Sequence, residues 1–170
     1  SGNEAAALAA IACDYDVMGY YPISPSTEIA QLIDMERSNG NTHMHLIPAD
    51  GEHSSAGICY GASLSGARVF NATSANGLSY MLEQLPVFSG TQIPMVMDLV
   101  TRSVSGPLNI HCEHTDLYSC LSLGWVILCA SDPQSVYDLN IIGLKIAEAI
   151  SMPVIVSYDG YLTSHQKHLI

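Results

Sequence analysis

Charged residues are scarce in this chain of 170 residues, and positive charge is the scarcest. Only 12% of the residues are charged, and five Lys and Arg stand against sixteen Asp and Glu, which gives a formal net charge of −11. Phosphate backbones and anionic membrane surfaces are bound by clustered cations, so nucleic acid and membranes are poor partners. A hydrophobic fraction of 48% is high for a free-standing domain and predicts burial against another domain or subunit.

Signatures of several other protein classes are also missing. No apolar run approaches the roughly 18–20 residues of a membrane span, and the first residues lack the basic region of a signal peptide. We therefore expect a cytoplasmic protein. The five Cys contain no Cys-x-x-Cys pair, which predicts free, mostly buried thiols and argues against an iron–sulfur cluster held by this chain alone.

Common catalytic and phosphate-binding motifs do not occur. There is no G-x-x-x-x-G-K loop and no G-x-G-x-x-G after a strand, so the chain has no loop that would hold phosphates. The segment 61–66 has serines between glycines but not the spacing of a serine nucleophile elbow. The histidine pairs 43/45 and 111/114 match no zinc spacing, and we assign no metal ligand.

Short apolar segments alternate with helical patterns along the chain. Helices are predicted over 4–13 with Asn3 as the cap, from Pro25 with Ser24 as the cap, from Glu52, over 78–88, and from Asp132 with Ser131 or Asp132 as the cap. Segments 73–77 and 101–116 are predicted to be a turn and a long loop. The predicted strands are 17–20, 44–48, 67–72, 94–100, 125–129 and 153–158. This alternation predicts a single α/β domain over 1–170, with a doubly wound, mostly parallel sheet of about six strands and helices on both faces.

Glu52 occupies the most informative position. It follows the apolar segment 44–48 and the turn at Asp50 and Gly51, and it begins a helix of small residues. In parallel α/β sheets this edge is where ligands bind. A carboxylate with so few polar neighbours is either a buried acid aimed at a ligand or a helix-N-terminal acid favoured by the helix dipole, and spacing alone favours the second interpretation.

Other polar residues follow the predicted strands and should converge on the same edge. Arg102, one of three Arg, follows a buried strand, where its planar fork would suit a ligand carboxylate. An ion pair with Glu113 or Asp116 explains Arg102 equally well. The full candidate set is Ser24, Glu52, Ser74, Asn76, Arg102, Asn109 and His114.

Four segments together resemble one enzyme family. They are Gly2-Asn3-Glu4-Ala5-Ala6, Tyr21-Pro22-Ile23-Ser24-Pro25-Ser26, Glu52-His53-Ser54-Ser55-Ala56-Gly57, and the run from Pro107-Leu108-Asn109-Ile110-His111 through His114-x-Asp116 to Asp159-Gly160-Tyr161-Leu162-Thr163-Ser164-His165. In order and spacing they are similar to the 2-oxoacid:ferredoxin (or other acceptor) oxidoreductases, such as pyruvate:ferredoxin oxidoreductase. The resemblance covers essentially the whole chain and implies the pyrimidine-binding domain of the thiamine diphosphate module, found at the N-terminus of the α chain or of the fused enzyme.

This resemblance implies a set of residue roles. Glu52 would hydrogen-bond N1′ of the cofactor's aminopyrimidine, with Pro22, Ser74 and Asn76 also at the cofactor. Arg102 would grip the substrate carboxylate, with Ser24 and Asn109 at the substrate. Ser24 stands where the family more often has Thr. Serine keeps the hydroxyl that would hydrogen-bond the substrate but lacks the methyl group, so the pocket is expected to be larger. Cys112 and Glu113 stand where the family commonly has Gly and Asp, so we expect this loop to differ in shape from the family's.

The resemblance also implies partners. The reaction would be oxidative decarboxylation of a 2-oxoacid, typically to acyl-coenzyme A and CO₂, with electrons passing through [4Fe–4S] clusters to ferredoxin or another acceptor. A β-type subunit or domain would bind the pyrophosphate and Mg²⁺, and an iron–sulfur subunit would carry the clusters. The final apolar pair of residues suggests a fragment of a longer chain. A transketolase-like thiamine enzyme and a non-catalytic assembly subunit with this fold remain as alternatives.

Overall fold

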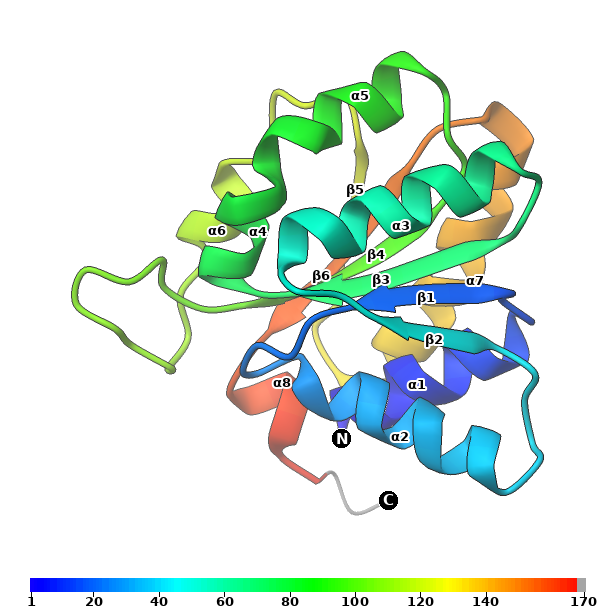
Figure 1. Ribbon diagram of the computed structural model, residues 1–170. Helices are drawn as coiled ribbons and strands as arrows, with labels where there is room; N and C mark the ends of the chain where they lie inside the picture. Colours follow the sequence, from blue (N-terminus) through cyan, green and yellow to red (C-terminus); the bar gives the residue numbers. More distant parts are fainter. Residues whose placement is uncertain (168–170) are drawn as a thin grey trace.

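The computed structural model describes residues 1–167, which form one six-stranded sheet with helices on both faces (Figure 1). All neighbouring strands are parallel, in the order β2-β1-β3-β4-β6-β5. The strands are β1 (Val17–Tyr20), β2 (His45–Pro48), β3 (Val69–Thr73), β4 (Val96–Thr101), β5 (Val126–Cys129) and β6 (Val154–Asp159). The predicted α/β fold with about six parallel strands is confirmed.

Three long helices cover one face of the sheet: α1 (Gly2–Ala12), α2 (Thr27–Ser38) and α7 (Pro133–Ile150). In Figure 1, α1 and α2 lie below the sheet and α7 runs behind it toward the upper right. Helix α1 buries mainly alanines and Gly2, so it packs closely against both α2 and α7. Alternate residues of β4 and β6, such as Val96, Val100 and Val156, complete this half of the core.

The opposite face carries α3 (Glu52–Leu64), α4 (Ala75–Met81), the 3₁₀ turn η1 (Leu82–Gln84) and α5 (Leu85–Gly90). Its core includes Phe88 and Trp125, and the Trp125 indole N–H donates to the Leu85 carbonyl at 2.7 Å. Two short helices, α6 (Thr115–Tyr118) and α8 (Leu162–His165), follow β4 and β6. No helix among residues 1–167 is long and apolar enough to cross a membrane.

The strand order changes direction beside β1. The chain passes from β1 outward to the edge strand β2, and then returns across β1 to form β3 on its other side. Reversals of this kind leave a crevice at the carboxyl ends of the strands, where ligands of open α/β sheets bind. The segments that leave β1, β2 and β3 therefore border the expected binding crevice.

Several predicted boundaries are wrong for identifiable local reasons. Helix α1 begins at Gly2 and is capped by Ser1, while Asn3 lies inside the helix and is fully buried. Helix α2 begins at Thr27, because the Ser26 and Thr27 N–H groups donate to the Ile23 carbonyl in a turn that precedes it. The predicted turn at 73–77 already contains the end of β3 and the first turn of α4. The predicted helix 78–88 is divided into α4, η1 and α5. Pro86 lies in the first turn of α5, where its missing N–H leaves no helical hydrogen bond unmade.

One carboxyl group lies in the middle of the core. Asp98 of β4 is fully buried, and Asn140 of α7 donates to its Oδ2 at 3.3 Å. Oδ1 of Asp98 and Oδ1 of Asn140 have no hydrogen-bond partner among the described residues. Burial raises the pKa of Asp98 well above its usual value, and the Asn140 hydrogen bond only partly opposes this. The folded protein therefore binds the Asp98 proton more tightly than the unfolded chain does.

Replacing Asp98 with asparagine is expected to remove a pH-dependent loss of stability. Because the pKa is raised on folding, the free energy of unfolding should be largest below the unfolded pKa, about 4, and should fall as pH rises through the folded pKa. An asparagine side chain cannot ionise and offers an N–H where Oδ1 now lies. The variant should therefore melt higher than wild type at neutral pH, with the difference vanishing near pH 4. Thermal unfolding followed by circular dichroism across pH 4–8 measures this, and a constant difference would contradict it.

Candidate functional site

The loops and helix ends at the carboxyl edge of the sheet carry most of the predicted site residues. Ser24 follows β1, Glu52 follows β2, Ser74 follows β3, and Arg102 follows β4. The parallel sheet therefore brings these four positions to one edge, as the sequence predicted. In Figure 1 the segment between β4 and α6 is a long loop that projects from this edge.

Glu52 is the first residue of α3, and its side chain is directed into the protein. It is 8% exposed, and no hydrogen bond or ion pair joins its carboxylate to another described side chain. The carboxylate packs against α4, since a Cβ on Gly77 would lie 2.7 Å from Glu52 Oε1 and 2.6 Å from Thr73 Oγ1. Only glycine at position 77 leaves room for it. The helix dipole favours this charge, but the position is that of a buried acid rather than a surface one.

Two hydroxyl groups near this acid also lack partners. Oγ1 of Thr73 and Oγ of Ser74 are buried and have no hydrogen-bond partner among residues 1–167. The next residue, Ala75, has φ of +40°, which is unusual for a residue with a side chain. Strained backbone and unpaired buried polar groups concentrate at functional sites, where a ligand completes the bonding.

Asp116 of α6 holds the strained turn at Ala75. The sequence had identified Asp116 only as a possible ion-pair partner of Arg102. It is fully buried, and its Oδ2 accepts the Ala75 N–H at 2.9 Å and the Arg102 backbone N–H at 3.1 Å. Burial raises the pKa of the Asp116 carboxyl, while these backbone hydrogen bonds act in the opposite direction. Asp116 thus ties the end of β4 to the start of α4. The sequence feature that could have indicated this role is the position of Asp116 at the end of a long polar loop, in the first turn of a helix.

Arg102 is 7% exposed, and its guanidinium group is fixed by backbone carbonyls. Nε donates to the Ser24 carbonyl at 2.8 Å, and Nη1 donates to the Ser103 carbonyl at 3.1 Å. Among the described residues Nη2 has no partner, and no carboxylate pairs with the group. The predicted alternative, an ion pair with Glu113 or Asp116, is wrong, because Asp116 accepts the backbone N–H instead. A buried, oriented cation with a free donor is suited to an anionic ligand.

The remaining candidates lie farther out on the same edge. Ser24 is exposed, and Pro22 is an exposed residue lining a cavity of about 260 Å³ between β1 and α2 that includes neither Glu52 nor Arg102. Asn76 is exposed, and its Oδ1 accepts both the N–H and the hydroxyl of Ser105 in the long loop.

Asn109 and His114 belong to the long loop itself. Asn109 is exposed and bonds only within the loop, to Ser103 and His111. The His114 ring contacts the Thr101 hydroxyl at 2.9 Å and lines a wide depression of about 590 Å³ beside β6. The compact group at this edge is therefore Glu52, Thr73, Ser74, Arg102 and Asp116, with Asn109 and His114 at its margin.

Comparisons with known proteins agree with this architecture. The model of the family described as pyruvate flavodoxin/ferredoxin oxidoreductase, thiamine diP-binding, matches residues 8–170. A solved 2-oxoglutarate:ferredoxin oxidoreductase from Magnetococcus marinus, with 2-oxoglutarate, coenzyme A and succinyl-CoA bound, superimposes with a TM-score of 0.86 and 30% identity. That alignment covers 96% of this chain and 29% of the other.

Two curated relatives show the same relationship in sequence. Pyruvate synthase subunit PorA of Thermotoga maritima is 38% identical over 167 residues, which is 97% of this chain. Ketoisovalerate oxidoreductase subunit VorA of Pyrococcus horikoshii is 38% identical over 170 residues, which is 100% of this chain. The chain spans 43% of the length of each of these relatives.

Proposed function

Since the chain belongs to the family of thiamine-diphosphate-binding domains of pyruvate flavodoxin/ferredoxin oxidoreductases, we propose that it forms the pyrimidine side of the active site in a 2-oxoacid oxidoreductase. Residues 1–170 act as one domain of that enzyme. The whole enzyme oxidatively decarboxylates a 2-oxoacid, typically to the acyl-coenzyme A and CO₂, and reduces ferredoxin or a similar acceptor. The observation that carries the proposal is Glu52, a buried residue at the sheet's carboxyl edge whose carboxylate has no hydrogen-bond or ion-pair partner among the described side chains.

The residues around Glu52 fit the polar edge of an aminopyrimidine. A carboxylate accepts a hydrogen bond from a ring nitrogen that carries a proton, and Glu52 at the carboxyl edge of the sheet can provide that acceptor. Thiamine diphosphate, when bound, supplies the electron sink that decarboxylation of a 2-oxoacid requires. Glu52 itself would hold the proton at the ring nitrogen, and at 8% exposure its side chain leaves little room for competing water. Pro22 and Asn76 belong to the same cofactor side in this proposal.

Arg102 and Ser24 form the substrate side. Two carbonyls fix the guanidinium of Arg102, so its free Nη2 is pre-oriented toward a carboxylate without rotamer entropy to lose on binding. The exposed Ser24 hydroxyl adjoins the carbonyl that holds Arg102 and is available for a second hydrogen bond, and Asn109 lies on the loop beyond.

Other chains or domains complete the enzyme in this proposal. Arg102 is the only buried cation among residues 1–167, and we assign it to the substrate. A β-type partner domain therefore supplies the diphosphate and Mg²⁺ site. Iron–sulfur clusters of the [4Fe–4S] type in a partner subunit carry the electrons, and coenzyme A enters as cosubstrate.

The proposal is tested by anaerobic viologen reduction with the native complex that contains this chain. The assay supplies thiamine diphosphate, Mg²⁺ and coenzyme A, and compares pyruvate, 2-oxoglutarate, 2-ketoisovalerate and phenylglyoxylate. We expect rapid reduction with at least one acid. Thiamine-dependent turnover in a complex without iron would instead favour a transketolase-like enzyme. A complex with neither reduction nor bound thiamine would identify an assembly subunit.

A further inference from the structure

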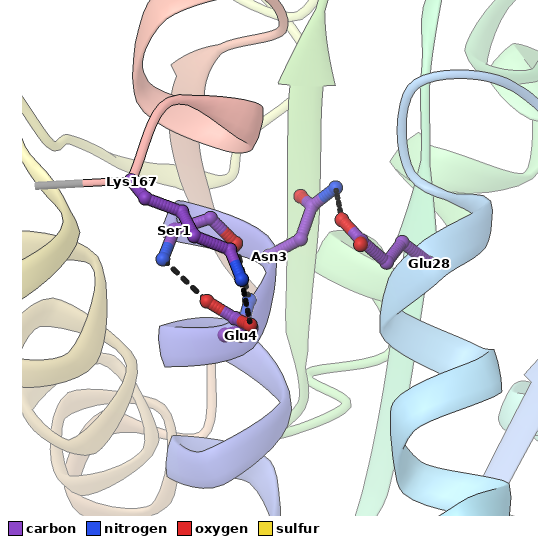
Figure 2. A network of polar contacts seen from close by, with 5 residues as sticks. All are labelled: Ser1, Asn3, Glu4, Glu28 and Lys167. Carbon is purple, nitrogen blue, oxygen red and sulfur yellow. Dashed lines mark hydrogen bonds and ion pairs between the residues drawn. The ribbon is translucent and has the colours of Figure 1, made fainter.

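The amide of Asn3 joins three separate parts of the chain. Although it lies in the first turn of α1, it is fully buried and takes no part in capping, because Ser1 caps that helix. Figure 2 shows Asn3 directed toward Glu28 of α2, whereas the adjacent Glu4 faces Ser1 and Lys167. The ion pairs of Glu4 contribute little to stability, because the Glu4 and Lys167 side chains are exposed to solvent. The buried Asn3 contacts are therefore the ones that fix structure.

Asn3 uses both ends of its amide. Its Nδ2 donates to the Pro25 carbonyl at 2.9 Å and to Glu28 Oε2 at 3.3 Å. Its Oδ1 accepts the hydroxyl of Tyr158, on β6, at 3.0 Å. Burial raises the pKa of Tyr158 well above its usual value, so its hydroxyl stays protonated and remains a donor. The Pro25 carbonyl can only accept a hydrogen bond, so it fixes Nδ2 on its own side and leaves Oδ1 to accept from the Tyr158 hydroxyl.

Pro25 is next to the residue that holds Arg102. The Ser24 carbonyl accepts from Arg102 Nε at 2.8 Å, so two consecutive carbonyls are bound by two buried side chains. The Pro25 ring is also enclosed, since a Cβ on Gly160 would lie 2.6 Å from Pro25 Cγ and would overlap the Thr101 carbonyl. A change in the Asn3 amide would therefore be transmitted through one peptide unit to the Arg102 guanidinium.

We propose that Asn3 and Tyr158 are positioning residues for Arg102: they fix the Ser24–Pro25 turn so that the guanidinium presents its free Nη2 to the ligand carboxylate. Neither residue touches the ligand. This inference rests on the proposed function only in naming that ligand as a 2-oxoacid. The arrangement of the turn itself is independent of the reaction.

The test uses Tyr158→Phe in the native complex, with Tyr15→Phe as the matched control. Both hydroxyls are buried on the same face of the sheet, but the Tyr15 hydroxyl has no partner among the described residues. Loss of the Tyr158 donor should raise KM for the 2-oxoacid about five- to tenfold, the effect of one lost hydrogen bond, with kcat within about twofold. The affinity for thiamine diphosphate, which depends on Glu52, should not change.

A second measurement does not depend on turnover. The amides of Ser26 and Thr27 both donate to the Ile23 carbonyl, so they report on the order of the turn. Hydrogen–deuterium exchange of the peptide covering 22–28 should accelerate in Tyr158→Phe and in Asn3→Ala, and not in Tyr15→Phe. The double variant should exchange no faster than Asn3→Ala alone, because both substitutions break the same chain of contacts.

The outcomes separate this inference from the proposed function. Faster exchange at 22–28 with no 2-oxoacid reaction in any variant, wild type included, would support the positioning role and overturn the proposed reaction. An unchanged KM and unchanged exchange in a fully active Tyr158→Phe complex would overturn the positioning role alone. A loss of kcat and melting temperature together with faster exchange throughout the chain would also overturn it, because Tyr158 would then serve the fold as a whole.

Discussion

Replacing Glu52 with glutamine is expected to lower 2-oxoacid-dependent turnover of the native complex by about 10²–10⁴-fold, the range found when a positioned proton-transfer group is removed. Glutamine keeps the shape and the acceptor oxygen but cannot hold a proton in exchange with a ring nitrogen. The same substitution breaks no side-chain hydrogen bond or ion pair among the described residues, and it removes a charge that the α3 dipole favours only modestly. We therefore expect the melting temperature to stay nearly level while activity falls.

Glu83→Gln is the matched control for this experiment. Glu83 lies close in sequence to α4 but is 78% exposed and paired with His53, so its substitution should leave turnover within about twofold. A Glu52→Gln enzyme with normal turnover would contradict the catalytic role. A variant that lost activity and melted much lower would show that Glu52 supports the fold instead.

Gly77 offers an independent way to displace the same carboxylate. Alanine at this position would place its Cβ 2.7 Å from Glu52 Oε1, so the carboxylate must move away from α4. Thiamine diphosphate affinity should therefore fall, although Glu52 is retained. Gly57→Ala is the comparison, because a Cβ there meets only Gln84 Oε1, at 3.9 Å. That variant should bind the cofactor normally and gain about 0.5–1 kcal/mol from better helix propensity.

The sheet and the position of Glu52 could be predicted from sequence because both depend on local patterns. Alternation of apolar strands and helices determines a parallel α/β sheet, and a carboxylate directly after a strand must lie at its ligand-binding edge. Whether Glu52 was buried could not be predicted, since that depends on Gly77 and Thr73 across an adjacent element. The spacing alone favoured a surface helix acid, and packing decided otherwise.

The contacts of Asn3 and Asp116 lay beyond local patterns altogether. Asn before a run of small residues is typical of a helix cap, but Ser1 takes that role and leaves Asn3 free to reach Pro25 and Tyr158, which is 155 residues away. Asp116 similarly looked like a charge partner for Arg102, whereas the structure gives it two backbone N–H groups from different segments. Such contacts are set by tertiary packing, which sequence periodicity does not encode.

Replacing Arg102 with lysine is expected to reduce kcat/KM for the 2-oxoacid by about 10- to 100-fold, and Arg102→Gln by about 10²–10³-fold, mostly through KM. Lysine keeps the charge but loses the planar fork, so it cannot hold the Ser24 and Ser103 carbonyls and still present a donor to the ligand. Glutamine also loses the charge that balances the carboxylate. Substrate affinity should fall in the order wild type, lysine, glutamine, whereas thiamine diphosphate affinity should stay constant.

Arg37→Gln is the control, because Arg37 also binds through Nε and Nη2, to Asp34, but its side chain is 48% exposed on α2. It should leave both kinetic constants within about twofold. Steady-state kinetics with viologen and calorimetric titration of thiamine diphosphate together distinguish the two halves of the site. If Arg102 variants lost cofactor affinity and kept KM, the arginine would belong to the cofactor side with Glu52. We expect this separation because the two side chains have different supports: Glu52 packs on α4, while the Arg102 guanidinium is held by the turn after β1.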